Sequence, residues 1–204
     1  MGGSAGGLKA FEQFFSNMPS DTGMAFVLLQ HLDPTHKCIL PELIQRKTNI
    51  KVFQIEDGMK VQPNCIYVIP PNKDLLIRQG ILKLSEPSAS RSLRMPIDFF
   101  FRHLAEDQGE KSICIIFPGM GTDGTLGLKA IKDRLGMVMV QDPETTEYNS
   151  MPLSAINTNL VDFTAPAEEL PTKLIGYINH LIKPLNQKPA AVEKNPVNCR
   201  KYLI

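Results

Sequence analysis

Apolar positions along this chain follow two alternating spacings, one typical of buried strands and one typical of amphipathic helices. Strand-like apolar runs occur at 24–30, 50–55, 65–69, 112–117, 137–140 and 160–163. Helical spacing occurs at 8–18, 36–47, 96–104, 126–136, 152–157 and 168–182. Continuous apolar runs are typical of strands that are covered on both faces. The alternation predicts a doubly wound α/β fold, in which a mostly parallel sheet carries helices on both faces in a three-layer, Rossmann-like arrangement.

One stretch departs from this alternation. Leu75 to Arg78 and Ile81 to Leu84 are short extended segments separated only by Gln79-Gly80. A two-residue turn of this kind joins antiparallel strands. The sequence therefore predicts an antiparallel hairpin attached to the main sheet.

The length of 204 residues suits one domain of ordinary size. From Pro184 onward the chain is rich in proline, lysine and asparagine and has no periodicity, as in linkers. We expect a domain over 1–183 and a linker or tail over 184–204.

Charge and cysteine content narrow the class of protein. The 22 Lys and Arg residues nearly balance 21 Asp and Glu residues, which argues against nucleic-acid binding through a strongly basic surface. No run approaches the roughly 18 apolar residues of a membrane span, and no secretory signal pattern opens the chain. The four cysteines are scattered without a framework, as expected of reduced thiols. These features predict a cytoplasmic protein without a membrane span.

The chain opens on a glycine-rich turn, and Gly2-Gly3-Ser4-Ala5-Gly6 fits the G-x-S-x-G pattern of a nucleophile elbow. The following helix would aim free N–H groups, such as those of Ala5 to Gly7, at a developing oxyanion. No strand pattern precedes the turn, although an elbow requires a strand there. The alternative is a plain glycine-rich turn that binds phosphate or no ligand.

His31 directly follows the predicted strand 24–30. The carboxyl end of a buried parallel strand borders the crevice in which open α/β sheets bind ligands. His31 is therefore a candidate general base for Ser4. The alternative is a histidine that caps the next helix or binds a loop carbonyl.

A second glycine turn follows the strand 112–117. Gly119, Gly121 and Gly124 satisfy G-x-G-x-x-G, and Asp142 lies about 20 residues further on, as in a dinucleotide-binding fingerprint. A dinucleotide-binding module that uses this turn and Asp142 is therefore one hypothesis. In a triad, Asp123 would instead orient His31, and it could also act as N-cap of the helix beginning near Gly124.

Several ordered segments together resemble one family. They are GGSAGG around Ser4, QHLDP around His31, IEDGMKVQPNCIYVIPPN at 55–72, MPIDFFFRHLAED at 95–107 and GMGTDG at 119–124. From Gly2 to about Ile182 the chain resembles the catalytic domain of the chemotaxis-type protein-glutamate methylesterases, the CheB family. The resemblance places the family's triad on Ser4, His31 and Asp123, and the methionine of its last glycine turn on Met120.

The resemblance implies a serine hydrolase that removes methyl esters from glutamyl side chains of chemoreceptor proteins and that deamidates receptor glutamines. No metal or organic cofactor is implied. Backbone N–H groups near Ala5 or Met120 are the candidate oxyanion donors. Many relatives have threonine where this chain has Ala5, and typical members have a strand before the serine and an N-terminal receiver domain. The resemblance therefore implies a methylesterase catalytic domain over 1–183 whose first strand is truncated.

Two segments, MPIDFFFRHLAEDQGE and QDPETTEYNSMP, are most similar to members fused to a receptor methyltransferase and sensor-kinase modules. Further domains of a longer signalling chain are therefore expected partners, beside the methylated receptor. A catalytically silent scaffold is a third hypothesis, because the elbow lacks a predicted strand.

A polar loop at 85–94 carries Arg91 and Arg94 ahead of the helix that begins at Pro96. One hypothesis is that these arginines contact acidic side chains around the receptor's glutamyl site. The alternative is that both are solvated loop residues.

Overall fold

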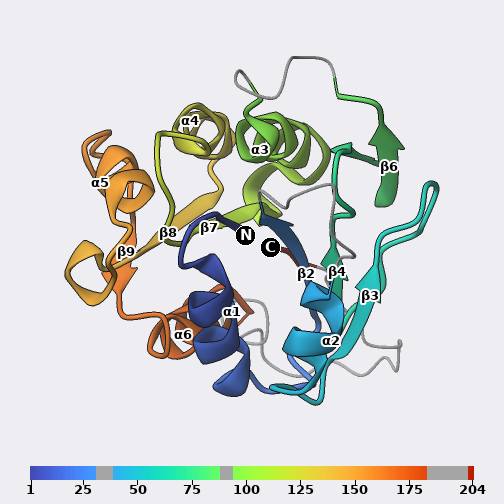
Figure 1. Cartoon of the computed structure of the whole chain (residues 1–204), viewed down its shortest axis with the longest axis horizontal. Helices are drawn as coiled ribbons and strands as arrows, with labels where there is room; N and C mark the ends of the chain where they lie inside the picture. The colour runs from blue at the N-terminus through green and yellow to red at the C-terminus, as the bar shows by residue number, and fades with distance from the viewer. Residues whose placement is uncertain (31–38, 88–93, 183–201) are drawn as a thin grey trace, which may run out of the picture.

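The computed structural model describes residues 1–30, 39–87, 94–182 and 202–204. In these residues eight parallel strands form one sheet in the order β3-β4-β2-β1-β7-β8-β9, with β10 also paired to β2 (Figure 1). The strands are β1 (Gly2–Gly3), β2 (Met24–Gln30), β3 (Lys51–Gln54), β4 (Cys65–Val68), β7 (Ile113–Ile116), β8 (Met137–Gln141), β9 (Phe163–Ala165) and β10 (Tyr202–Leu203). The helices are α1 (Gly7–Ser16), α2 (Leu40–Gln45), α3 (Pro96–Gln108), α4 (Thr125–Asp133), α5 (Ser150–Ile156) and α6 (Leu170–Ile182), with short 3-10 turns at Gly109–Lys111 and Pro143–Thr145.

Helices cover both faces of the sheet, which confirms the predicted doubly wound fold. Helices α1, α2 and α6 lie on one face, and α3, α4 and α5 lie on the other (Figure 1). On the first face the rings of Phe11, Phe14 and Phe117 meet edge to face within one buried cluster. On the second face, Phe100 and Phe101 of α3 pack with Leu128 of α4 in a separate buried cluster. The strands β2, β4, β7 and β8 are thus buried on both sides, as their continuous apolar runs require, whereas the edge strand β3 is largely exposed.

The predicted hairpin is confirmed as β5 (Asp74–Arg78) and β6 (Ile81–Ser85), which form a two-stranded antiparallel sheet of their own. Gln79 and Gly80 both have positive φ, as a tight hairpin turn requires. The carboxylate of Asp107 on α3 accepts the backbone N–H groups of both turn residues. The hairpin is therefore attached to α3 rather than to an edge of the main sheet.

The structure corrects two expectations about the ends of the chain. Gly2–Gly3 do form a strand before Ser4, pairing with Leu29 and Gln30 on one side and, through Gly2, with Ile116 on the other. Residues 202–204, assigned to the tail, lie in the same sheet. Tyr202 and Leu203 pair in parallel with Met24 and Ala25, the first residues of β2.

The two chain ends lie in line along β2. The amide of Val27 donates to the carbonyl of Ile204, and the amino group of Met1 donates to the carbonyl of Val27 at 2.7 Å. Met1 and Ile204 are fully buried. β10 thus occupies the position beside the start of β2, and β1 the position beside its end.

The strand predicted at 160–163 lies later in the chain, at Phe163–Ala165. Thr158 and Asn159 terminate α5, and Asn159 adopts a left-handed conformation. This turn moves the start of β9 beyond the predicted segment. In the described part of the chain, no helix is long and apolar enough to cross a membrane.

Candidate active site

Ser4 lies in the turn between β1 and α1, at the carboxyl end of the sheet. Its backbone N–H donates to the carbonyl of Pro118 at 2.8 Å, and its carbonyl accepts the N–H of Gly7 at 2.9 Å. The side chain of Gln30, at the end of β2, also reaches the Ser4 carbonyl at 3.5 Å. Ser4 is therefore held between the ends of β2 and β7 in a half-buried position.

Small residues are required in this turn for steric and conformational reasons. A Cβ atom on Gly2 would lie 2.5 Å from the side chain of Ile97, and one on Gly3 would lie 3.2 Å from Phe11. Gly6 has a φ of 78°, in the left-handed region that favours glycine. The G-x-S-x-G pattern therefore reflects close packing as well as access to Ser4.

The second glycine turn packs directly on the first. A Cβ atom on Gly119 would lie 2.9 Å from the Cβ of Ser4. Gly119 is fixed by two backbone hydrogen bonds, from its N–H to the carbonyl of Tyr148 and from the N–H of Met151 to its carbonyl. The next residue, Met120, is 66% exposed. The fold thus brings together two turns that are more than 100 residues apart in the sequence.

Asp123 is a buried carboxylate, only 2% exposed. Its two oxygens accept the backbone N–H groups of Ile97 and Asp98 at 3.1 and 2.9 Å, in the first turn of α3. The N-cap of α4 is Gly124, without a side-chain cap hydrogen bond. The suggested N-cap role of Asp123 toward α4 is therefore wrong: Asp123 caps the neighbouring helix α3, because the N-terminal end of α3 lies beside this turn.

The candidate oxyanion donors are Ala5 and Met120. The N–H of Gly7 is already bonded to the Ser4 carbonyl, which leaves it unsuited to the role suggested for 5–7. Within the described residues, no protein acceptor contacts the backbone N–H of Ala5 or of Met120. Both amides belong to the turns that meet at Ser4.

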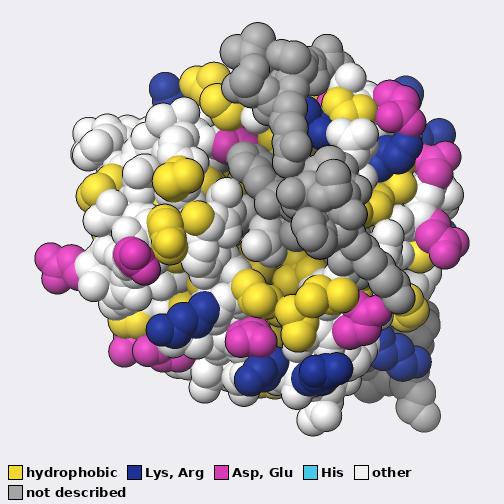
Figure 2. Space-filling model, in the orientation of Figure 1, with side chains coloured by type: hydrophobic (Ala, Val, Ile, Leu, Met, Phe, Trp, Pro, Cys, Tyr) yellow, Lys and Arg dark blue, Asp and Glu magenta, His cyan; other side chains and the backbone are white. Residues whose placement is uncertain are grey.

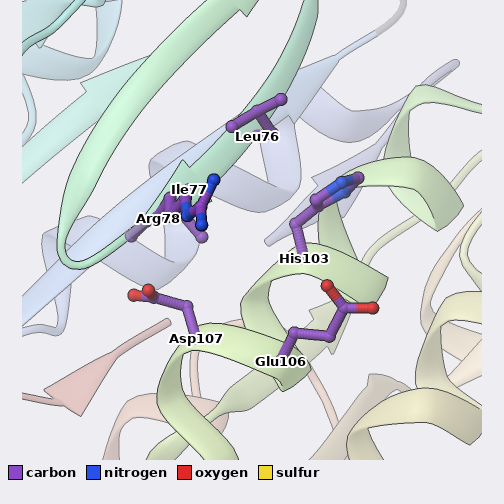
Figure 3. A pocket seen from close by; sticks show the side chains of 6 residues that line it. All are labelled: Leu76, Ile77, Arg78, His103, Glu106 and Asp107. Atoms are coloured by element: carbon purple, nitrogen blue, oxygen red, sulfur yellow. The ribbon is translucent and has the colours of Figure 1, made fainter.

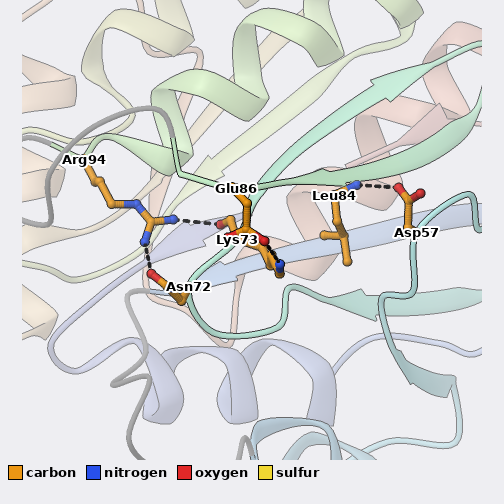
Figure 4. Close-up of polar contacts among 6 residues, drawn as sticks. All are labelled: Asp57, Asn72, Lys73, Leu84, Glu86 and Arg94. Carbon is orange, nitrogen blue, oxygen red and sulfur yellow. Dashed lines mark hydrogen bonds and ion pairs between the residues drawn. The ribbon is translucent and has the colours of Figure 1, made fainter.

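His31 and Arg91 lie outside the described residues. Arg94 is described, and its side chain is 15% exposed. Figure 4 shows the Arg94 side chain between Asn72 and Lys73. The Arg94 guanidinium donates to Asp74 at 2.9 Å, to the carbonyl of Lys73 and to Asn72. Arg94 is thus not a solvated loop residue, and its ion pair holds the segment before α3 against the start of β5.

The dinucleotide hypothesis is not supported by the contacts at its two acidic positions. Asp142 caps the 3-10 turn Pro143–Thr145 by accepting the N–H of Glu144 at 3.0 Å. Asp123 places a buried carboxylate within the glycine turn itself, where it would repel a pyrophosphate. Among the described residues, no three His, Cys, Asp or Glu side chains gather as metal ligands do.

Two of the hollows on the described surface lie near Ser4 or near the hairpin. One of about 140 Å³ borders the Ser4 turn, with Gly6, Pro118 and Tyr148 among its lining residues. The other, of about 460 Å³, lies between β5 and α3 and is lined by Leu76, Ile77, Arg78, His103, Glu106 and Asp107 (Figure 3). In the second hollow Asp107 is bonded to the hairpin turn and His103 to the carbonyl of Phe99. Only the first hollow borders the candidate site.

Charge on the face shown in Figure 2 is mixed. Lys and Arg side chains lie beside Asp and Glu side chains around the rim, and hydrophobic side chains are exposed nearer the middle.

The buried thiol of Cys114 has its pKa raised to about 12 by burial, so it stays protonated near neutral pH. Its burial agrees with the reduced, inert thiol expected there.

Sequence reasoning missed Gln30 and Asp98 as neighbours of the site. Gln30 had a signal, its position one residue before His31 at the end of a buried strand. Asp98 looks in sequence like an ordinary acid in the first turn of its own helix. Its carboxylate instead accepts the N–H of Gly127 in α4 at 2.6 Å.

Comparison with known proteins places this geometry in a family. The CheB methylesterase family matches residues 1–174. A relative from Leptospira interrogans is 32% identical over 171 residues, which cover 83% of this chain and 89% of that protein. A Thermotoga maritima protein-glutamate methylesterase/protein-glutamine glutaminase is 30% identical over 87% of this chain, which spans only 53% of that relative.

The fold comparison agrees. The crystal structure of the Thermotoga maritima CheB methylesterase catalytic domain superposes with a TM-score of 0.79 at 30% identity, covering 86% of this chain and 95% of that domain. With the Ser4 turn, the buried Asp123 and the parallel sheet between them, these matches show that the chain belongs to the CheB methylesterase family.

Proposed function

We propose that this chain is a serine hydrolase that removes methyl esters from glutamyl side chains of chemoreceptor proteins, and that it deamidates receptor glutamines by the same acyl chemistry. The observation that carries the proposal is the packing of the nucleophile's turn on the turn of Asp123. The Ser4 N–H donates to the carbonyl of Pro118 at 2.8 Å, and a Cβ atom added to Gly119 would lie 2.9 Å from the Cβ of Ser4. Family membership supplies the substrate class, since relatives are named protein-glutamate methylesterase/protein-glutamine glutaminase.

In the proposed mechanism, the Ser4 hydroxyl attacks the side-chain carbonyl carbon of the methyl glutamate, and His31 accepts its proton. His31 then donates that proton to the methoxy oxygen as the C–O bond breaks and methanol leaves. Water, deprotonated by His31, attacks the acyl-enzyme, and the proton returns to Ser4 as the glutamate is released. For a glutamine substrate the leaving group is ammonia.

Asp123 has the role of the buried acid that orients His31 and stabilises its protonated form. The α3 amides that bind both carboxylate oxygens fix the position of the Asp123 carboxylate. The amides of Ala5 and Met120 would bind the oxyanion of the tetrahedral intermediate. None of these steps uses a metal or an organic cofactor.

We assign this activity to a catalytic unit over 1–183, completed by residues 202–204, which pair with β2. The methylated chemoreceptor is its protein substrate. Further domains of a longer signalling chain would be its other partners. Arg91 keeps its proposed role in binding acidic receptor side chains. For Arg94, the ion pair with Asp74 supports a role in holding this loop in place rather than in direct docking.

Methanol release from a methylated receptor fragment tests the proposal. Replacing Ser4 by alanine should lower kcat by about 10⁴-fold or more, as loss of a serine nucleophile does. A serine-directed phosphonyl fluoride should label Ser4 in the folded chain, and His31→Ala should abolish the labelling. Equal methanol release by the chain and by Ser4→Ala would overturn the proposal.

A further inference from the structure

Two buried carboxylates join the N-terminal ends of α3 and α4 reciprocally. Asp123, just before α4, accepts the N–H groups of Ile97 and Asp98 in the first turn of α3. Asp98, in that same turn, accepts the N–H of Gly127 in the first turn of α4 at 2.6 Å. Each helix therefore supplies the carboxylate that satisfies the free amides of the other.

The two helices approach so closely here that only glycine fits at Gly127. A Cβ atom there would lie 2.6 Å from the Cβ of Phe101 and 3.0 Å from the Cα of Asp98. Gly124 is nearly as crowded, since its Cβ would lie 3.1 Å from the side chain of Ile97. The distance between the helices is thus fixed by backbone contact as well as by the two carboxylates.

We propose that Asp98 is a positioning residue for Asp123: by holding the first turn of α4 against α3, its carboxylate fixes where the Asp123 carboxylate lies. Only three residues separate Asp123 from Gly127, so movement of the α4 end moves Asp123 directly. This inference rests on the proposed function, in which Asp123 is the acid of the triad.

The electrostatics of the pair agree with a constrained arrangement. Burial raises the pKa of Asp98, and the negative charge of Asp123 raises it further, whereas the Gly127 and Leu126 amides and Arg102 oppose this. Among the described residues, Asp123 and Arg102 are the charged groups acting on Asp98. Two acids are kept together here despite their repulsion, which is consistent with a geometric requirement.

Three substitutions separate position from charge. Asp98→Asn keeps an oxygen that can accept the Gly127 N–H, and it should retain kcat within about threefold because the acceptor geometry is preserved. Asp98→Ala removes the acceptor, and Asp98→Glu keeps the charge but displaces it by one methylene. Both should lower kcat by about 10- to 100-fold with KM unchanged, as misplacement of a catalytic group does.

The pH profile supplies a readout that a purely structural role would not change. In Asp98→Ala, the acid limb of kcat/KM should move to lower pH, because His31 would lose its negative partner and release its proton more readily.

The matched control is Asp162→Ala. Asp162 also accepts a backbone N–H, from Val138 at 2.8 Å, and it pairs with Lys132 in the last turn of α4. It thus holds the other end of the same helix, at the amino end of β8 and away from Ser4. The Asp162→Ala variant should be less stable than the unmodified chain, but its kcat and its pH profile should be unchanged.

Methanol release by the unmodified chain and by Ser4→Ala is measured in the same assay. If those two are equal, the proposed function fails. If the unmodified chain is active but folded Asp98→Ala matches Asp162→Ala in kcat and pH profile, the positioning role is contradicted. If Asp98→Ala does not fold, the test uses the kcat values of Asp98→Asn and Asp98→Glu instead. The proposal predicts a lower kcat for Asp98→Glu, and equal kcat values in these two variants would overturn it.

Discussion

The two glycine turns that meet at Ser4 differ in whether a carboxylate lies at the neighbouring helix N-terminus. At the turn 119–124, Asp123 binds the amides of α3, and Asp98 binds an amide of α4, so both helix ends face a carboxylate. At the Ser4 turn, in the described residues, the first turn of α1 has no acid and no side-chain cap. A helix N-terminus without a neighbouring acid favours a nearby negative charge. One turn therefore already has carboxyl groups at its helix ends, and the other suits a negative charge that forms during the reaction.

The two turns also differ in the strands that precede them, because β1, before Ser4, directly follows the buried amino group of Met1. The dependence of stability on pH should show this difference, with the largest effect predicted here. Burial lowers the pKa of the Met1 amino group from its usual value near 8.0 to about 5, although Cys114 opposes the shift. Because the folded pKa is lower, the unfolded chain binds the proton more readily between these values. Stability should be full above about pH 8 and should fall by up to about 4 kcal/mol as the pH falls to about 5.

Urea denaturation at a series of pH values measures this loss. Acetylation of the Met1 nitrogen is the control, because the acetylated nitrogen keeps its N–H but cannot be protonated. The acetylated chain should lose less stability over the same pH interval. Identical pH dependence in both forms would show that the amino group is not buried beneath the Ser4 turn.

The contact between the turns predicts the next effect. Gly119→Ala would place a Cβ 2.1 Å from the Sδ of Met151 and 2.9 Å from the Cβ of Ser4. It should lower kcat by about 100-fold, because both side chains must move and Ser4 is the nucleophile. Gly136→Ala is a matched control, since its Cβ would lie 2.5 Å from Ser112 Oγ, at the amino ends of β7 and β8. It should destabilise the chain without lowering kcat in the remaining folded protein. Equal kcat in the two folded variants would contradict the role of this contact.

The smallest predicted effect tests the electrostatic difference. Ala5→Asp would give the Ser4 turn the acid that it lacks, and its carboxylate would compete with the oxyanion for the α1 amides. We expect kcat/KM about tenfold below that of Ala5→Asn, which has the same size without the charge. The aspartate should also stabilise the folded chain by about 0.3–1 kcal/mol relative to asparagine. Equal kcat/KM for the two variants would mean that this helix end does not stabilise negative charge.

Local periodicity was enough to predict most elements. The strand 24–30 was predicted with the bounds of β2, and the hairpin was found from its two-residue turn. Such elements depend on the spacing of apolar residues and on turn chemistry within a few positions. The same local reasoning missed β1 and β10, because strands this short are defined by hydrogen bonds to β2 rather than by their own residues.

For the candidate site, the sequence singled out Ser4 and Asp123 because each lies in a glycine turn with a recognisable pattern. It could not determine what Asp123 binds, since its partners on α3 lie 25 and 26 residues away. Nor could it distinguish a solvated Arg94 from one paired with Asp74, 20 residues earlier.

The amino-acid sequence by itself determined the order of the longer strands and helices, the small residues around Ser4 and the presence of an acid in the second turn, because these depend on neighbouring residues. The pairing of Asp123 with α3, of Asp98 with α4 and of Gly119 with Ser4 arose only when the sheet brought distant segments together. Hydrogen bonds and steric contacts act over a few ångströms, and the members of these pairs come that close only in the folded chain because they lie far apart in the sequence.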